Sequence, residues 1–205
     1  FEACLEDQAQ QERYLFVWLH GKSSPAMPLE DLCKFHQHLR RRTFFCVPTS
    51  PQAVGETHFE WALSCNKDQR TGGMGFIFGV LNEVYLSALS GAIRHVRDKV
   101  CPTHTIVCGF SMGGFGAFQL GSHAPQLFDA VISVAGYGVG TLEGTVSVAG
   151  NGVSTGYHPP QPQSAQIFRT WLTKHAPQLA TVRRIIVVHK AHDRVSSFND
   201  TEAIV

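Results

Sequence analysis

A serine stands between two glycines at the end of a short apolar run, and this arrangement allows few backbone conformations. Residues 105–108 are Thr-Ile-Val-Cys, and Gly109-Phe110-Ser111-Met112-Gly113 follows them directly. A short apolar run is typical of a buried strand, and the small and apolar residues up to 118 favour a helix. Glycine permits a turn that is too tight for a side chain. The sequence therefore predicts a strand, a sharp corner at Ser111 and a helix.

A serine at such a corner has the pattern of a nucleophile elbow, Gly-x-Ser-x-Gly. The strained backbone lifts the Ser111 hydroxyl clear of the sheet, and the amide of Met112 at the helix start can stabilise an oxyanion. A glycine-rich turn that only packs a helix onto a sheet is the alternative. A phosphate-binding loop is disfavoured, because no Gly-Lys-Ser/Thr follows and the glycines do not have the dinucleotide spacing.

Length and charge restrict the class of protein further. The chain has 205 residues, of which 43% are hydrophobic, and this suits one domain with a sizeable core. Its 17 basic and 16 acidic residues give a net charge of +1, so nothing indicates nucleic acid as a partner. No apolar run reaches the length of a membrane span. The chain begins with Phe1 and lacks a signal-peptide pattern, which suggests a processed or incomplete N-terminus.

The six cysteines are scattered along the chain without a Cys-x-x-Cys pair. Neither a zinc site nor a disulfide framework is therefore predicted. Cys46 and Cys108 fall within predicted strands and are expected to be small core residues. This usage of cysteine favours a reducing compartment such as the cytoplasm.

Apolar runs alternate with helical patterns along the chain, which predicts an α/β fold: a mostly parallel central sheet with helices on both faces. We expect residues 1–205 to form one domain. Strands are predicted at residues 13–19, 43–47, 105–110, 129–135 and 184–188, and helices at 28–42, 81–99 and 112–122. A further helix is expected to be capped by Ser164 and to end before Pro177.

Two connections between these elements are long. Residues 49–79 show no clear pattern and contain Trp61, which could line a substrate pocket or pack in the core. Residues 136–163 are rich in glycine, and they combine an alternating run at 145–148 with the turn signal Asn151-Gly152. This segment predicts a β-hairpin insertion that could form a cap over the site.

The first predicted strand ends in His20-Gly21-Lys22. In serine hydrolases of the α/β class, the loop after such a strand supplies the second oxyanion amide. By position we expect this amide to be that of Lys22, with Ser23 next. His20 is expected to brace the loop rather than to transfer a proton.

A serine hydroxyl becomes a good nucleophile only when a histidine takes its proton, and the imidazolium formed needs an acid beside it. Asp193 follows the last predicted strand by a few residues, and the chain order of serine before acid is that of the α/β class. The sequence therefore predicts Asp193 as the acid. An aspartate in a surface loop is the alternative.

These segments together resemble the α/β-hydrolase superfamily, in particular its carboxylesterase, phospholipase-like and feruloyl-esterase-like branch. The likeness lies in strand-His-Gly at 14–21, Gly-Phe-Ser-Met-Gly-Gly at 109–114 and strand-His-x-x-x-Asp-x-Val at 187–195. It implies an ester or thioester substrate, an acyl-enzyme intermediate and no metal or organic cofactor. The residue roles that it implies are Ser111 as nucleophile, Asp193 as triad acid, and the amides of Met112 and Lys22 as oxyanion donors.

The sequence departs from the family pattern after the acid. The family places its catalytic histidine beyond one more helix and strand, and no histidine follows Asp193 before Val205. Residues 199–205 are typical of a helix that is just beginning. We therefore expect the histidine beyond residue 205, and little or no activity from residues 1–205 alone. His158, in the region rich in glycine and proline, is the alternative base.

The substrate is expected to be a small molecule or an acyl group. Phe110, Tyr137 and Trp61 suit an apolar acyl or aryl group, although most of the aromatic residues near the serine are expected to be core. Two alternatives stay open: a hydrolase-like protein that serves as a binding or assembly module without catalysis, and a transferase that passes the acyl group to an alcohol.

Overall fold

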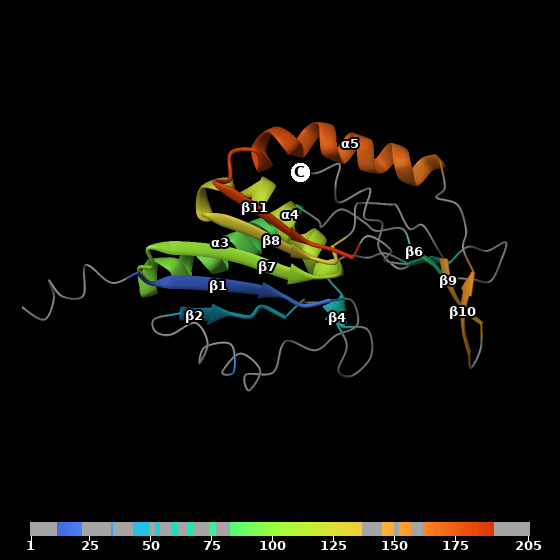
Figure 1. The fold of residues 1–205 in the computed structure, drawn as a ribbon, viewed down its shortest axis with the longest axis horizontal. Helices are drawn as coiled ribbons and strands as arrows, with labels where there is room; N and C mark the ends of the chain where they lie inside the picture. Colours follow the sequence, from blue (N-terminus) through green and yellow to red (C-terminus); the bar gives the residue numbers. More distant parts are fainter. Residues whose placement is uncertain are drawn as a thin grey trace, which may run out of the picture.

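The fold is built on a sheet of five parallel strands (Figure 1). The computed structural model describes residues 12–21, 34, 43–49, 52–53, 59–60, 65–67, 74–76, 83–136, 145–149, 152–156 and 162–190. The strand order is β11-β8-β7-β1-β2, so the strand that leads to Ser111 is central. The five strands are β1 (Tyr14–Leu19), β2 (Thr43–Cys46), β7 (His104–Phe110), β8 (Ala130–Val134) and β11 (Arg184–Val188).

The helices whose bounds the structure describes are α3 (Glu83–Val100), α4 (Met112–His123) and α5 (Pro162–Leu179), and a 3-10 turn, η1 (Pro125–Leu127), follows α4. Helix α4 is buried from Met112 to Ser122 because it packs against β7 and β8 on one side and α5 on another. An all-round apolar helix is the pattern expected for such a position. Among the described residues, none of the helices has the length and hydrophobicity that crossing a membrane requires.

The hydrophobic core lies between the sheet and these helices. In β1, Leu15, Val17 and Leu19 are fully buried while the residues between them are partly exposed. Successive side chains of a strand point to opposite faces, so these three leucine and valine side chains share the face toward α3 and α4. The ring of Trp171 in α5 lies 5.1 Å from that of Phe115 in α4, at an angle of 61°.

The predicted strands and the predicted helices at 81–99 and 112–122 are confirmed, with boundaries that shift by at most two residues. Cys108 is buried in β7 and Cys46 packs against the core from β2, as expected. The helix predicted over residues 28–42 lies outside the described residues, apart from Lys34, which is helical. The mostly parallel α/β architecture is therefore as predicted.

Helix α5 differs from its prediction at both ends. It begins at Pro162, so Ser164 is not its cap, and it continues through Pro177 to Leu179. A proline in a helix interior costs about 3 kcal/mol, because it removes a hydrogen bond and its ring meets the preceding turn. Trp171 and Leu179 are 3% and 1% exposed, and burying two such side chains contributes about 2 kcal/mol or more each. Tertiary packing thus offsets the local preference of Pro177.

Short antiparallel ribbons occupy the long connections. Strands β9 (Thr145–Ala149) and β10 (Gly152–Gly156) pair in antiparallel register, and Ala149 already pairs with Gly152, one residue ahead of the predicted turn. The sequence shows no clear pattern in the connection 49–79, but the structure contains two short antiparallel pairs there. These are β3 (Gln52–Ala53) with β4 (Phe59–Glu60), and β5 (Cys65–Lys67) with β6 (Met74–Phe76). Strands of two or three residues are too short to give a periodic pattern.

Candidate active site

Ser111 lies between the last residue of β7 and the first residue of α4. Its backbone has φ 54° and ψ −117°, in a region that residues other than glycine rarely adopt. The Ser111 side chain is partly exposed, whereas that of the following residue, Met112, is only 3% exposed. Backbone strain of this kind costs about 1–3 kcal/mol and gathers at active sites. The corner that the sequence predicts at Ser111 is present.

Two glycines allow this corner because the backbones around them are in close contact. A Cβ added at Gly109 would lie 2.1 Å from the carbonyl oxygen of Gly113. A Cβ added at Gly113 would lie 2.2 Å from the carbonyl oxygen of Leu19. Both distances are far shorter than any real contact of a Cβ atom. The spacing of the two glycines therefore lets the start of α4 approach both its own strand and β1.

The loop after β1 lies beside Ser111. A Cβ added at Gly21 would lie 3.6 Å from the Cβ of Ser111 and 3.2 Å from the Cδ1 atom of Phe110. The structure thus brings together the two segments that the sequence singles out at residues 20–21 and 109–113. Lys22, the expected second oxyanion donor, is the next residue of the chain and lies outside the described residues, as does Ser23.

His20 is buried at the base of this loop, with 2% of its surface exposed. Its Nδ1 donates a hydrogen bond to the carbonyl oxygen of Gly21 over 2.8 Å, which fixes the position of the Nδ1 proton. Burial lowers the pKa of His20 below its ordinary value, because the charged imidazolium loses its hydration. A buried, neutral ring bonded to the loop backbone fits the bracing role expected for His20.

We expect the stability of the protein to fall in mild acid partly through His20. In the unfolded chain His20 binds a proton near pH 6.5, whereas in the folded state its pKa is lower. Its full contribution to the free energy of unfolding is therefore present above pH 6.5. This contribution declines as the pH falls below that value, because the unfolded state then binds more protons. His20→Asn keeps a donor for Gly21 but does not titrate. Urea unfolding between pH 7 and pH 5 should therefore show a weaker pH dependence in His20→Asn than in the wild type.

His95→Asn is the matched control, because His95 is exposed on α3. Its unfolding curve should retain the pH dependence of the wild type. If the free energy of unfolding changed equally with pH in the wild type and in His20→Asn, this would contradict a buried, neutral His20.

The end of β8 holds the elbow in place, and the sequence analysis does not single it out. The amide of Ser111 donates to the carbonyl oxygen of Val134 over 2.8 Å, and the amide of Ala135 donates to that of Val188 over 2.7 Å. Ala135 has a positive φ of 48°. The only sequence signal is the pair of small residues Ala135-Gly136 directly after an apolar strand. These bonds connect the carboxyl ends of β7, β8 and β11.

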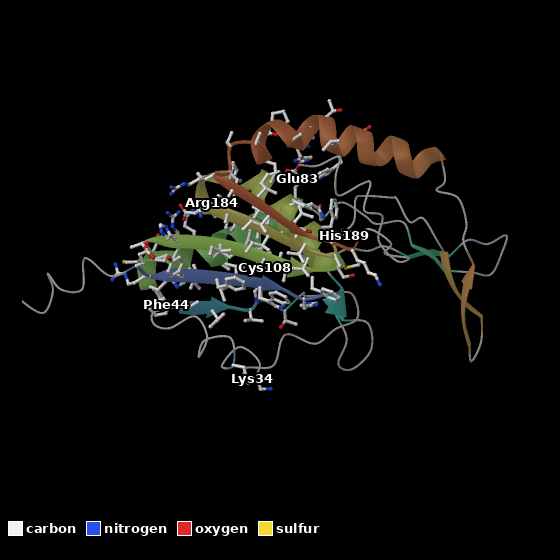
Figure 2. All side chains as sticks on the ribbon, in the orientation of Figure 1. Lys34, Phe44, Glu83, Cys108, Arg184 and His189 are labelled. Carbon is white, nitrogen blue, oxygen red and sulfur yellow. The ribbon has the colours of Figure 1, made fainter. Side chains whose placement is uncertain are left out.

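The acid predicted from the sequence follows the last of these strands. Figure 2 shows Arg184 and His189 at opposite ends of β11, so that the chain leaves this strand at the same edge of the sheet that carries Ser111. Two strand spacings separate β11 from β7, about 10 Å, and five extended residues after Val188 span up to about 17 Å. Asp193 itself lies outside the described residues, so its role stays a prediction.

The remaining predicted site residues are only partly described. Phe110 directly precedes Ser111 and is 47% exposed. Trp61, Tyr137 and His158 lie outside the described residues. Within the described part of the chain, none of the hydrogen bonds joins a histidine ring to the Ser111 hydroxyl, and no group of three or more His, Cys, Asp or Glu side chains could hold a metal ion.

Cys108 is the other potential nucleophile near the corner, and its environment makes it unreactive. Its side chain is 4% exposed within β7. Burial raises the pKa of the Cys108 thiol to about 12, because the thiolate would lose its hydration. The nucleophilic thiolate is therefore not populated at neutral pH. Of these two groups, only the Ser111 hydroxyl is accessible.

Comparison with known proteins finds a matching family and a related enzyme. The family described as "Putative esterase" matches residues 88–196. Iron(III) enterobactin esterase of Escherichia coli (strain K12) is 31% identical over 134 residues, which are 63% of this chain and 30% of the relative. The chain thus spans about a third of the length of that relative.

Solved structures of low sequence identity share the fold. The structure of esterase PE8 has a TM-score of 0.52 at 19% identity and covers 94% of this chain and 90% of its own. TT1662 from Thermus thermophilus has a TM-score of 0.57 at 13% identity, with coverage of 95% and 73%. Est1E from Butyrivibrio proteoclasticus, solved with ferulic acid bound, has a TM-score of 0.54 at 10% identity, with coverage of 96% and 77%.

Proposed function

Because this chain belongs to the putative esterase family and has the α/β-hydrolase fold, we propose that the full-length protein hydrolyses a carboxylic ester or thioester through an acyl-enzyme on Ser111. The observation that carries the proposal is the backbone of Ser111, which is held at φ 54° between a central strand and a buried helix. A strained, partly exposed serine at this position has no evident packing role. Its use as a nucleophile explains the strain.

The proposed reaction has two steps. The Ser111 oxygen attacks the acyl carbon while a histidine outside the described residues takes the hydroxyl proton, and the tetrahedral intermediate then expels the alcohol or thiol, which receives that proton. Water attacks the resulting acyl-enzyme with the same histidine as base and releases the carboxylic acid. We propose that Asp193 orients this histidine and stabilises its positive charge.

Two backbone amides are proposed to bind the oxyanion. Met112 is the first residue of α4, where amides point away from the helix and the helix dipole favours negative charge. Lys22 follows Gly21, where an added Cβ would lie 3.6 Å from the Cβ of Ser111. We propose that the Lys22 amide meets the oxyanion from the loop after β1 while the Met112 amide meets it from α4, which is the arrangement that the α/β-hydrolase mechanism needs.

Phe110 is proposed to contact the acyl or aryl part of the substrate, with Trp61 and Tyr137 as further walls. Burying half of a phenylalanine ring contributes about 1.4 kcal/mol, equivalent to about a tenfold rate effect. Phe110→Ala should therefore lower kcat/KM about tenfold for a naphthoyl ester and leave an acetyl ester of the same alcohol nearly unchanged. Measuring both rates in one protein cancels any loss of folded material.

Phe44→Ala is the control for that comparison, because Phe44 is 39% exposed on β2, at the edge of the sheet. It should change neither rate. An equal loss of both rates in Phe110→Ala would show that Phe110 supports the fold rather than the substrate.

Residues 136–163 are proposed to cap the site. Figure 1 shows β9 and β10 beyond the carboxyl ends of the sheet strands, and β9 contacts β6 from the other long connection. Both ribbons thus lie on the side of the sheet where Ser111 is found, which supports the proposal.

The function is tested by labelling the full-length protein with a fluorophosphonate, which reacts only with an activated serine. Mass spectrometry of the digested protein should find the adduct on the peptide that contains Ser111. A folded protein that hydrolyses no ester and takes up no label would instead be a binding or assembly module.

A further inference from the structure

A second pocket lies at the amino ends of the strands, at the opposite edge of the sheet from Ser111. Its volume is about 430 Å³, and we name it the amino-edge pocket. It brings together the starts of β1, β7, β8 and β11, which are far apart in the sequence. Its polar lining consists of Glu12, Tyr14, His104, Asp129, Arg183 and Arg184.

One of the two acidic side chains of the pocket is already held by its neighbours. The Tyr14 hydroxyl donates a hydrogen bond to Oε2 of Glu12, and Nε2 of His104 lies 3.9 Å from Oε1 of the same carboxylate. The rings of Tyr14 and His104 are in contact, with centroids 5.2 Å apart. Glu12, Tyr14 and His104 thus form a connected group in which the negative charge of Glu12 has a partner.

The other acidic side chain secures the start of β7. Oδ2 of Asp129 accepts a hydrogen bond from the amide of Thr105 over 2.8 Å, and the amide of Asp129 donates to the carbonyl oxygen of Thr105 over the same distance. Asp129 therefore fixes β7 beside the segment that leads into β8. Its carboxylate has a structural partner, as a buried or half-buried charge requires.

Among the described residues, no interaction partner is found for the two arginines of the pocket. Arg183 and Arg184 are exposed, and within the described part of the chain neither guanidinium takes part in an ion pair or a hydrogen bond. Both line the same pocket, so an anion bound there gains Coulomb attraction from both positive charges. A guanidinium presents its donors as a planar fork that matches a carboxylate or a phosphate.

We propose that the amino-edge pocket binds a small organic anion, whose phosphate or carboxylate group lies against Arg183 and Arg184. The volume falls within the range of about 300–1,000 Å³ that is typical of small-molecule sites, so the pocket has room for more than an inorganic ion. Ile106 and Ala130, which pair with each other across β7 and β8, supply apolar wall for the body of the ligand.

This site is separate from the esterase centre. Strand β7 runs from His104 at the pocket to Phe110 beside Ser111, and seven residues of a parallel strand span about 20 Å. Figure 2 shows Arg184 at the amino end of β11, away from the end that carries His189. The anion is therefore not the ester substrate, and its binding does not depend on the proposed function.

Isothermal titration calorimetry of the intact protein tests the proposal, with ribose 5-phosphate, succinate and uncharged ribose as probes. Ribose 5-phosphate and succinate show whether the pocket prefers a phosphate or a carboxylate. Ribose shows how much of the affinity comes from the uncharged sugar alone. We expect saturable binding of at least one anion, weakened by added salt. Arg183→Gln and Arg184→Gln should each weaken it roughly 10- to 100-fold, because each removes a charge-assisted hydrogen bond.

Arg94→Gln is the matched control, since Arg94 is exposed on α3 and does not line the pocket. It should leave the affinity unchanged. Absence of binding by both anions would overturn the proposal. Equal binding of ribose, or an affinity that survives both pocket substitutions together, would also overturn it. Because no ester is present in the titration, none of these results bears on Ser111.

Discussion

Replacing Ser111 with alanine is expected to lower kcat for ester hydrolysis by a factor of about 10⁴ to 10⁶ in the active protein. The reason is that the acyl-enzyme cannot form without the Ser111 oxygen, whereas substrate binding and the oxyanion amides remain. Initial rates with p-nitrophenyl acetate measure the loss, and KM should change little. Fluorophosphonate labelling of the same variant should disappear.

Ser87→Ala serves as the control, because Ser87 is an exposed serine on α3, away from the elbow. It should keep both turnover and labelling. A Ser111→Ala protein that is folded and still hydrolyses the ester at the wild-type rate would refute the proposed nucleophile. Circular dichroism should show that the variant is folded, since the Ser111 side chain is partly exposed.

Gly113→Ala is expected to destabilise the fold by about 3 kcal/mol or more. The added Cβ would lie 2.2 Å from the carbonyl oxygen of Leu19 and 2.5 Å from that of His20. Both are backbone atoms inside the sheet or at its end, so they cannot turn aside as a flexible side chain could. The start of α4 would have to move away from β1, and a whole domain is stable by only about 5–15 kcal/mol. Urea unfolding measures the loss.

Gly91→Ala, which also replaces a glycine in a helix, is expected not to destabilise the protein. Gly91 lies in the middle of α3, and a Cβ added there meets nothing within 4 Å. Alanine is favoured over glycine in a helix by about 0.5–1 kcal/mol, so this variant should be slightly more stable than the wild type. If Gly113→Ala were as stable as Gly91→Ala, close approach of α4 to β1 would not be the reason for the glycine.

The Gly113→Ala prediction rests on the close approach of the start of α4 to the end of β1. In Gly113→Ala, movement of α4 would also carry the Met112 amide away from Ser111 and from the loop that contains Gly21. Any Gly113→Ala protein that remains folded should therefore lose ester hydrolysis beyond its loss of stability. The two measurements separate a steric requirement of the fold from a requirement of the chemistry.

The sequence determined the elements whose cause is local. Ser111 is at a corner because Gly109 and Gly113 flank it, and glycine at both positions removes the Cβ atoms that would prevent the turn. The five main strands and the helices α3 and α4 follow from apolar runs and from periodicity, which reflect how each segment buries its own side chains. His20 and Phe110 were singled out because they adjoin these local signals. The position of the sharp corner at Ser111 could therefore be predicted from the sequence alone.

Only the tertiary structure decided which segments became neighbours. The strand order put Gly21 beside Ser111, joined the amide of Ser111 to Val134, and assembled the amino-edge pocket from residues as distant as Glu12 and Arg184. It also carried α5 through Pro177, where packing outweighed the local preference. A hydrophobic pattern specifies that one face of an element is buried, but it does not specify which other element covers that face. The free energy of burial depends on the apolar area removed from water, whereas the neighbours depend on the order and direction of the strands.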